Sequence, residues 1–159
     1  MSKSIPVFRS LRSRQLVELL QNGAVGVLPT DTLYGIVAQA GNKEAVERVY
    51  ALRKRSPEKP CIVLISSIAD LSQFTIRPSD RIREVLSRLW PGPVSIILPC
   101  TAKKFEYLHR GTKTLAFRLP KSAPLRSLLA KTGPLIAPSA NPEGEKPAYT
   151  ITSVRKYFD

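Results

Sequence analysis

The sequence predicts an α/β domain in which helices cover a sheet, and three observations lead to this fold class. Short apolar runs typical of buried strands alternate along the chain with amphipathic helical segments. The chain has 159 residues, which suits one domain with a sizeable core. No repeat, low-complexity tract or linker divides it, so residues 1–159 are expected to form a single domain.

Six helical segments are expected from capping residues and apolar periodicity. The clearest begins after Asn42, whose side chain can cap it, and carries its apolar residues on one face. Gly23 and the sequence Pro91-Gly92-Pro93 end the helices before them, since neither residue type continues a helix. The expected ranges are 13–22, 43–55, 68–74, 80–90, 123–131 and 152–158.

Strands are expected in the apolar runs that lie between these helices and are bounded by turn residues. The runs cover residues 24–29, 61–66, 94–99, 115–120 and 134–138. Residues 33–40 form either a further extended segment or a partly helical one. Residues 139–148 are polar and rich in proline, which predicts a loop.

Positive charge is the unusual feature of the composition. Lys and Arg number 25 against 12 acidic residues, for a net charge of +13, which favours RNA, nucleotides or an anionic membrane as partners. In residues 52–60, Glu58 is the only acid, so the cations have no other counter-charge nearby in the sequence. In residues 103–131, Phe105 and Tyr107 are available to stack on bases. Both stretches also fit a solvated surface, and the first lies at a helix end, where cations complement the dipole.

The cysteines and the N-terminal region bear on where the protein works. Cys61 and Cys100 lie in apolar runs and are expected to be buried, reduced thiols rather than disulfide or zinc ligands. The N-terminal region lacks the apolar segment of a signal peptide, and no run is long enough to span a membrane. A cytoplasmic protein without membrane contact is expected, and Arg9, Arg12 and Arg14 leave organelle targeting as an alternative.

Three polar features are candidate sites, because each follows or interrupts a predicted strand. "PTDTLYG" (29–35) offers two hydroxyls and a carboxylate, and "PSAN" (138–141) offers donors to an anion. Arg118 interrupts an apolar strand, and its fork of donors can clamp a carboxylate or a phosphate. An ordinary turn explains the first two features as simply, and a solvent-facing strand position explains Arg118.

Asp31 and His109 are weaker candidates. Asp31 could hold a metal ion or orient an amine, but a turn-forming role is favoured. His109 is the only histidine and lies among basic residues, so we expect a solvated, non-catalytic loop residue. Glycine-rich phosphate-binding motifs are absent, so a bound nucleotide would depend on side chains and loop amides.

Five stretches in one order give the chain a specific resemblance: "PTDTLYG", "RKRSPEKP", "WPGPVSIIL", "LAFRLP" and "PLIAPSANPEG". Together they resemble the YrdC/Sua5 family, the threonylcarbamoyl-AMP synthases, from about Gly23 to Ala148. The resemblance implies a YrdC-like twisted mixed sheet with a basic concave face. It also implies a nucleotidyltransferase that makes threonylcarbamoyl-AMP and pyrophosphate from L-threonine, bicarbonate (or CO2) and ATP, with Mg²⁺ on the phosphates. Partner proteins would then transfer the threonylcarbamoyl group to adenosine 37 of tRNA, giving N6-threonylcarbamoyladenosine (t6A).

The same resemblance implies two groups of ligand-binding residues, with no named catalytic residue and no metal ligand from the protein. Threonine-binding roles fall on Thr30, Thr32, Arg118 and Ala137. ATP-binding roles fall on Arg53, Arg55, Lys59, Thr114, Ser139 and Asn141.

Two departures from the family pattern accompany the resemblance. Arg53 stands where the family usually has lysine, and the chain stops at Asp159, whereas many relatives continue with a segment that helps close over the nucleotide. Two other functions therefore stay open. One is a module of the same fold that binds tRNA or double-stranded RNA without full synthase activity. The other is a carbamoyl-handling domain like the YrdC-like part of hydrogenase maturation proteins.

Overall fold

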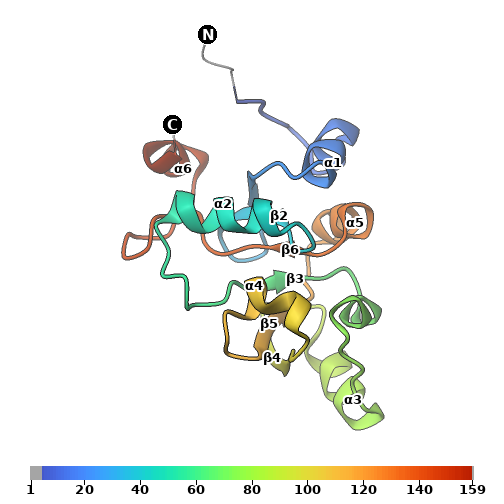
Figure 1. The fold of residues 1–159 in the computed structure, drawn as a ribbon. Helices are drawn as coiled ribbons and strands as arrows, with labels where there is room; N and C mark the ends of the chain where they lie inside the picture. Colours follow the sequence, from blue (N-terminus) through green and yellow to red (C-terminus); the bar gives the residue numbers. More distant parts are fainter. Residues whose placement is uncertain (1–4, 159) are drawn as a thin grey trace.

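The computed structural model describes residues 5–158, and a six-stranded mixed sheet forms its centre (Figure 1). The strands are β1 (Gly26–Pro29), β2 (Tyr34–Gln39), β3 (Val63–Leu64), β4 (Ile96–Pro99), β5 (Thr114–Arg118) and β6 (Leu135–Ile136). Their order across the sheet is β1-β2-β6-β3-β5-β4. The pair β3 and β5 is parallel, and the other neighbours are antiparallel. The predicted α/β class and mixed sheet are confirmed.

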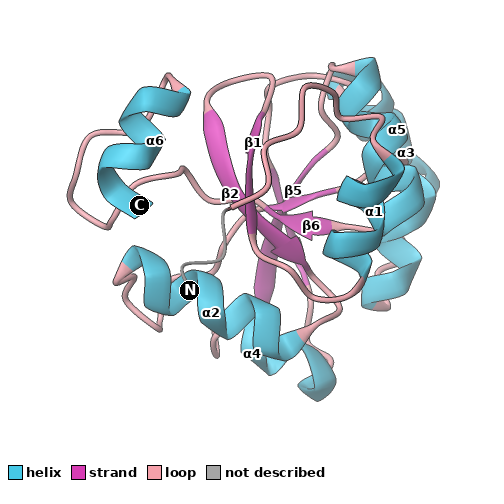
Figure 2. Ribbon diagram, turned by 90° about the horizontal axis from the view of Figure 1, so that it is seen from above, coloured by secondary structure: helices cyan, strands magenta, loops and turns pink. Residues whose placement is uncertain are grey.

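Helices cover both faces of the sheet, as Figure 2 shows from above. They are α1 (Arg14–Gln21), α2 (Lys43–Arg53), the 3₁₀ helix η1 (Ile68–Phe74), α3 (Asp80–Leu89), the 3₁₀ turn η2 (Lys103–Phe105), α4 (Glu106–His109), α5 (Ala123–Thr132) and α6 (Ile151–Phe158). Side-chain caps begin several of them: Asn42 accepts from the Ala45 amide at α2, and Ser122 accepts from the Leu125 amide at α5. None of the helices within residues 5–158 combines the length and apolar character needed to cross a membrane.

The sheet separates two hydrophobic cores because successive strand residues point to opposite faces. In β6, Ile136 packs into the core beneath α2, whereas Leu135 packs into the core beneath α1 and α5. In β3, Val63 and Leu64 divide in the same way. Each short inner strand therefore contributes to both cores.

Several elements differ from their expected ranges. Residues 33–40, expected to be extended or partly helical, contain the strand β2. The runs at 61–66 and 134–138 form strands of only two residues each. Pro134 and Pro138, which cannot donate to the ladder, flank the second of them. The helix expected to reach residue 55 ends at Arg53, because Lys54 takes a left-handed conformation with φ 49°. The η2–α4 segment was not expected, because it is too short to show a helical period.

Cys61 and Cys100 are free and buried, as expected. Burial raises the pKa of both thiols, so each stays protonated at neutral pH. Both therefore act as small apolar side chains of the core.

Phe117 gives a test of this architecture. It is fully buried near the end of β5, and its ring packs against that of Phe74 with 5.1 Å between the centroids. We expect Phe117→Ala to lower the free energy of unfolding by about 3–5 kcal/mol, through lost burial and the cavity left behind. Ile97 in the adjacent edge strand is 69% exposed, so Ile97→Ala should cost less than about 0.5 kcal/mol. Urea denaturation measures both, and equal costs would contradict the assignment of the two faces.

Candidate functional site

Thr30 builds the turn between β1 and β2. Its Oγ1 accepts hydrogen bonds from the amides of Thr32 and Leu33, each at 3.2 Å, and donates to the Leu33 carbonyl at 2.6 Å. The Thr32 hydroxyl lies 3.1 Å from that of Thr30, and the Thr32 side chain is exposed. Within this turn, Thr32 is therefore better placed to meet a ligand, while the Thr30 hydroxyl is occupied by the backbone.

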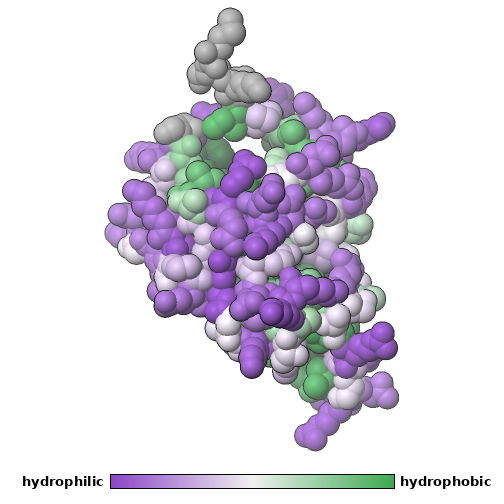
Figure 3. All heavy atoms as spheres, viewed as in Figure 1, coloured by the Kyte–Doolittle hydropathy of each residue, from purple (hydrophilic) through white to green (hydrophobic). Residues whose placement is uncertain are grey.

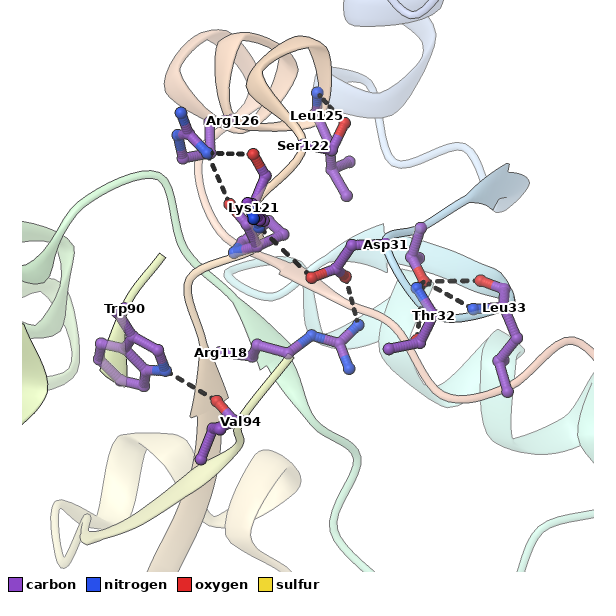
Figure 4. Close-up of polar contacts among 12 residues, drawn as sticks. Asp31, Thr32, Leu33, Trp90, Val94, Arg118, Lys121, Ser122, Leu125 and Arg126 are labelled. Carbon is purple, nitrogen blue, oxygen red and sulfur yellow. Dashed lines mark hydrogen bonds and ion pairs between the residues drawn. The ribbon is translucent and has the colours of Figure 1, made fainter. Parts of the chain in front are cut away.

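The side chain of Asp31 points away from the turn and contacts Arg118 at the end of β5 (Figure 4). Its Oδ1 lies 3.2 Å from Nη2 of Arg118, and its Oδ2 accepts a hydrogen bond from the Lys121 amide at 3.3 Å. Both side chains of the ion pair are only 10% exposed. The expected turn-forming role of Asp31 is wrong, because Thr30 makes the bonds that close the turn. A solvent-facing Arg118 is also wrong, since its side chain is nearly buried.

Arg53 fastens the loop 139–148 to the end of α2. It is 3% exposed, and it donates from Nε to the Asn141 carbonyl at 2.9 Å and from Nη2 to Ser139 Oγ at 3.3 Å. The Arg53 carbonyl accepts from the Glu143 amide at 2.8 Å. Burial and the nearby Arg55 lower the pKa of this guanidinium, although an arginine stays charged in proteins. The structure thus brings together three of the predicted ATP-binding residues.

Two further cations of this turn, Arg55 and Lys59, are also engaged within the protein. Arg55 donates to the carbonyls of Lys59 and Pro60, at 3.1 and 2.9 Å. The Lys59 ammonium pairs with one carboxylate oxygen of Glu143, and the other accepts from the Ser56 amide. In the fold, Lys59 therefore gains a counter-charge that the sequence around it does not offer, whereas Arg55 is held by carbonyls. Glu143 supplies the charge from 84 residues away, so no local sequence signal could reveal it.

Tyr50 supports the same turn from α2. Its hydroxyl donates to the Lys59 carbonyl at 2.8 Å. Burial raises the pKa of Tyr50 to about 12, so the phenol keeps the proton that this bond requires. The turn is thus built by side-chain donors rather than by a glycine-rich backbone.

Gly35 joins the two groups of residues. Gly35 forms an isolated antiparallel β-bridge with Ser139, and the neighbouring Ile36 amide donates to the Pro138 carbonyl at 2.9 Å. A Cβ added at Gly35 would lie 3.3 Å from Thr30 Cγ2 and 3.6 Å from Ala137 Cβ, so the hairpin packs tightly against this loop. The predicted threonine-side and ATP-side residues therefore meet at the start of β2.

Thr114 and His109 lie apart from this meeting point. Thr114 begins β5 and Arg118 ends it, and no hydrogen bond or ion pair in residues 5–158 links Thr114 to the other predicted ligands. The expectation that His109 is a solvated loop residue is wrong. It ends α4, is 4% exposed, and its Nδ1 accepts from the Gly111 amide at 3.2 Å. Its predicted lack of a catalytic role stays a prediction.

The basic stretch 103–131 is only partly available to a partner. Figure 3 shows hydrophilic side chains over most of the face that carries α2 and α4. Phe105 is buried and packs against Phe74, so it cannot stack on a base as expected. Tyr107 is half-buried and donates its hydroxyl to the Ala40 carbonyl at 2.7 Å. The predicted basic concave face stays a prediction.

Glu143 gives a test of the contact between the two loops. The hydrogen bonds from Lys59 and from the Ser56 amide hold the pKa of this carboxyl below its ordinary 4.5. A lowered folded-state pKa stabilises the fold above the unfolded pKa, and that stabilisation is lost as the pH falls through the folded value. The stability difference between wild type and Glu143→Gln should therefore be full at neutral pH and shrink below about pH 4.5.

Urea denaturation from about pH 7 to about pH 3 measures this difference, because acid titration of native carboxylates appears directly in stability. Glu58→Gln is the matched control, because Glu58 lies in the same turn but is exposed. A difference that does not depend on pH, or one shared by the control, would contradict a stabilising role of the Glu143 carboxylate.

Comparisons with known proteins agree on one family. The model of the Sua5/YciO/YrdC family, described as "Telomere recombination", matches residues 18–159. A protein of Bacillus subtilis (strain 168) named threonylcarbamoyl-AMP synthase is 35% identical over 138 residues, covering 86% of this chain and 40% of the relative. A protein of the same name from Halorhodospira halophila is 30% identical over 161 residues, covering 99% of this chain and 83% of the relative.

A solved structure gives the same result in three dimensions. The crystal structure of P. abyssi Sua5 complexed with L-threonine superposes with a TM-score of 0.84 at 27% identity, over 91% of this chain and 43% of that one. The chain thus spans less than half of the Bacillus and P. abyssi proteins, but most of the Halorhodospira protein. Because the family model covers nearly the whole chain and a relative at 30% identity aligns over most of its own length, the chain belongs to the Sua5/YciO/YrdC family.

Proposed function

We propose that this chain is a threonylcarbamoyl-AMP synthase, a nucleotidyltransferase that acts on L-threonine, bicarbonate and ATP. Relatives that bear this name, and a related structure that holds L-threonine, support the proposal. The product would supply the t6A modification of tRNA through partner proteins, in the cytoplasm. An RNA-binding module without synthase activity is disfavoured, because it would have no need for a buried arginine beside a hydroxyl-bearing turn.

The observation that carries the proposal is the environment of Arg118. Its side chain is nearly buried, its one ion pair in residues 5–158 is with Asp31, and its Nε has no hydrogen-bond partner there. Figure 4 shows the second terminal nitrogen of Arg118 directed away from Asp31. A planar guanidinium with unused donors is suited to bind a carboxylate at two points. Thr32 and Ala137 would line the rest of the threonine site.

ATP would lie along the other group of residues, as its Mg²⁺ complex. Arg55, Lys59, Ser139 and Asn141 would contact it, with Arg53 holding the loop and Thr114 completing the set. The residues described contain no cluster of three or more His, Cys, Asp and Glu side chains that could hold a metal ion. Phosphate oxygens and water would therefore supply the ligands of a Mg²⁺ that arrives with the nucleotide.

The proposed reaction needs alignment and charge neutralisation more than a covalent nucleophile. Threonine and bicarbonate form a carbamate, whose oxygen attacks the α-phosphorus of ATP and expels pyrophosphate. Fixed cations around the phosphates stabilise the charge that develops, and a fixed threonine carboxylate aims the carbamate. Purified protein incubated with threonine, bicarbonate and ATP labelled at the α-phosphate tests the proposal, which requires threonine-dependent formation of threonylcarbamoyl-AMP.

Arg118→Lys tests whether the guanidinium of Arg118 binds the threonine carboxylate at two points. Lysine keeps the charge but cannot bind a carboxylate at two points, so we expect the threonine concentration for half-maximal synthesis to rise about 10- to 100-fold, in keeping with the roughly 1.5–3 kcal/mol of a charged hydrogen bond. The requirement for ATP should change little. Arg88→Lys on the exposed face of α3 is the control. An unchanged threonine requirement would remove Arg118 from the threonine site.

The net charge of +13 also leads us to expect that the protein binds RNA. Fluorescence anisotropy with labelled tRNA should show an affinity that falls at least tenfold between about 50 and about 200 mM salt, because each neutralised phosphate releases counterions. A neutral polymer of similar size is the control. Binding that is indifferent to salt, or absent at the lowest salt, would contradict a basic RNA-binding surface.

A further inference from the structure

The ion pair of Asp31 and Arg118 is incompletely satisfied for a buried pair. Both side chains are 10% exposed, and their charged atoms lie 3.2 Å apart. Within residues 5–158, neither Asp31 Oδ1 nor Arg118 Nε has a hydrogen-bond partner of good geometry. Buried charges are costly unless their remaining donors and acceptors are also bonded. The unused capacity on both members points to a ligand that bears both charges.

Asp31 neither closes the hairpin turn nor caps a helix, and its two contacts instead tie the hairpin to Arg118 and Lys121. Thr30 closes the hairpin turn, and Ser122 caps the following helix α5. The Lys121 amide holds the other carboxylate oxygen of Asp31, which fixes the direction of Oδ1 (Figure 4). The Lys121 amide thus fixes the carboxylate through Oδ2, and Oδ1 lies beside the Arg118 guanidinium with no hydrogen bond of good geometry from residues 5–158.

We propose that Asp31 binds the α-ammonium group of threonine while Arg118 binds the α-carboxylate, an inference that rests on the proposed function. An amino acid zwitterion carries its two charges on neighbouring groups, as this ion pair does. When the zwitterion lies antiparallel to the ion pair, its ammonium faces the Asp31 carboxylate and its carboxylate faces the Arg118 guanidinium. This arrangement adds no net charge to a buried site. A lone arginine would accept any small carboxylate, whereas the pair selects an amino acid.

The chemistry makes Asp31 a residue of substrate selection rather than of the adenylyl transfer itself. When threonine and bicarbonate form the carbamate, an N–C bond forms, a C–O bond of bicarbonate breaks, and water and a proton leave. The nitrogen loses its positive charge and gains a carboxylate, which Asp31 repels. The contact therefore stabilises bound threonine, so its loss should weaken threonine binding more than it slows turnover of the bound complex.

Calorimetric titration with two ligands tests the inference. One is L-threonine, and the other is 2,3-dihydroxybutanoate of the same configuration, in which a hydroxyl replaces the ammonium. We expect wild type to prefer threonine about 10- to 100-fold, the range given by one charge-assisted hydrogen bond. In Asp31→Asn this preference should fall below about threefold, while dihydroxybutanoate binding changes little. Asp80→Asn, which neutralises an exposed carboxylate on α3, is the matched control.

Each other outcome overturns the inference in a distinguishable way. Equal binding of the two ligands by wild type overturns it without any variant. A preference that persists in Asp31→Asn assigns ammonium recognition elsewhere. Tighter binding of both ligands by the variant would show that Asp31 competes with their carboxylate for Arg118 and does not bind the ammonium. Wild-type protein that binds no threonine, with or without a non-hydrolysable ATP analogue, defeats the proposed function itself.

Discussion

The pairing of β6 on both of its sides is the interaction on which the rest of the structure depends. Its two residues pair with β2 on one side and with β3 on the other, and so join the β1–β2 hairpin to the remaining strands. Leu135 and Ile136 also enter opposite cores. The strand leads directly into the loop that carries Ser139, so the same pairing sets the position of that loop against Gly35. A slip of one residue would exchange the cores and misplace the loop.

The site built on this frame neutralises two of its cations. Arg118 holds Asp31, and Lys59 holds Glu143, so the chain's own carboxylates already face two of the cations proposed to bind substrates. For the nearly buried Arg118, this pairing avoids the cost of an isolated buried charge while the site is empty. Its cations are held in place by contacts from distant parts of the chain. Preorganisation of this kind lowers the cost of ordering side chains when substrates bind.

The sequence was sufficient for the features that depend on neighbours along the chain. The cap and apolar stripe after Asn42 predicted α2, and the ordered motifs identified the family and the loops of the site. Features that depend on residues far apart in the sequence could not be predicted from it. The short strands β3 and β6 exist because the sheet brings them together, and their prolines obscure their limits. The Glu143 contact and the reach of Asp31 to Arg118 both depend on how the hairpin and loops fold over the sheet. His109 looked solvated because its neighbours in sequence are basic, whereas packing of α4 buries it.

Thr30 shows that a family motif can be retained for the backbone alone. Its hydroxyl is taken up by the amides and the carbonyl of its own turn, and Arg53 is likewise taken up by the loop that it anchors. Selection for a stable fold would preserve Thr30 in a descendant that had abandoned the chemistry, whereas Arg53 already departs from the lysine usual in the family. The buried pair of Asp31 and Arg118 is weak evidence for a stabilising role, because well-packed apolar residues of similar volume often do as well. In a newly sequenced relative, positions 31 and 118 would therefore say more about the proposed chemistry than position 30, which the turn itself requires.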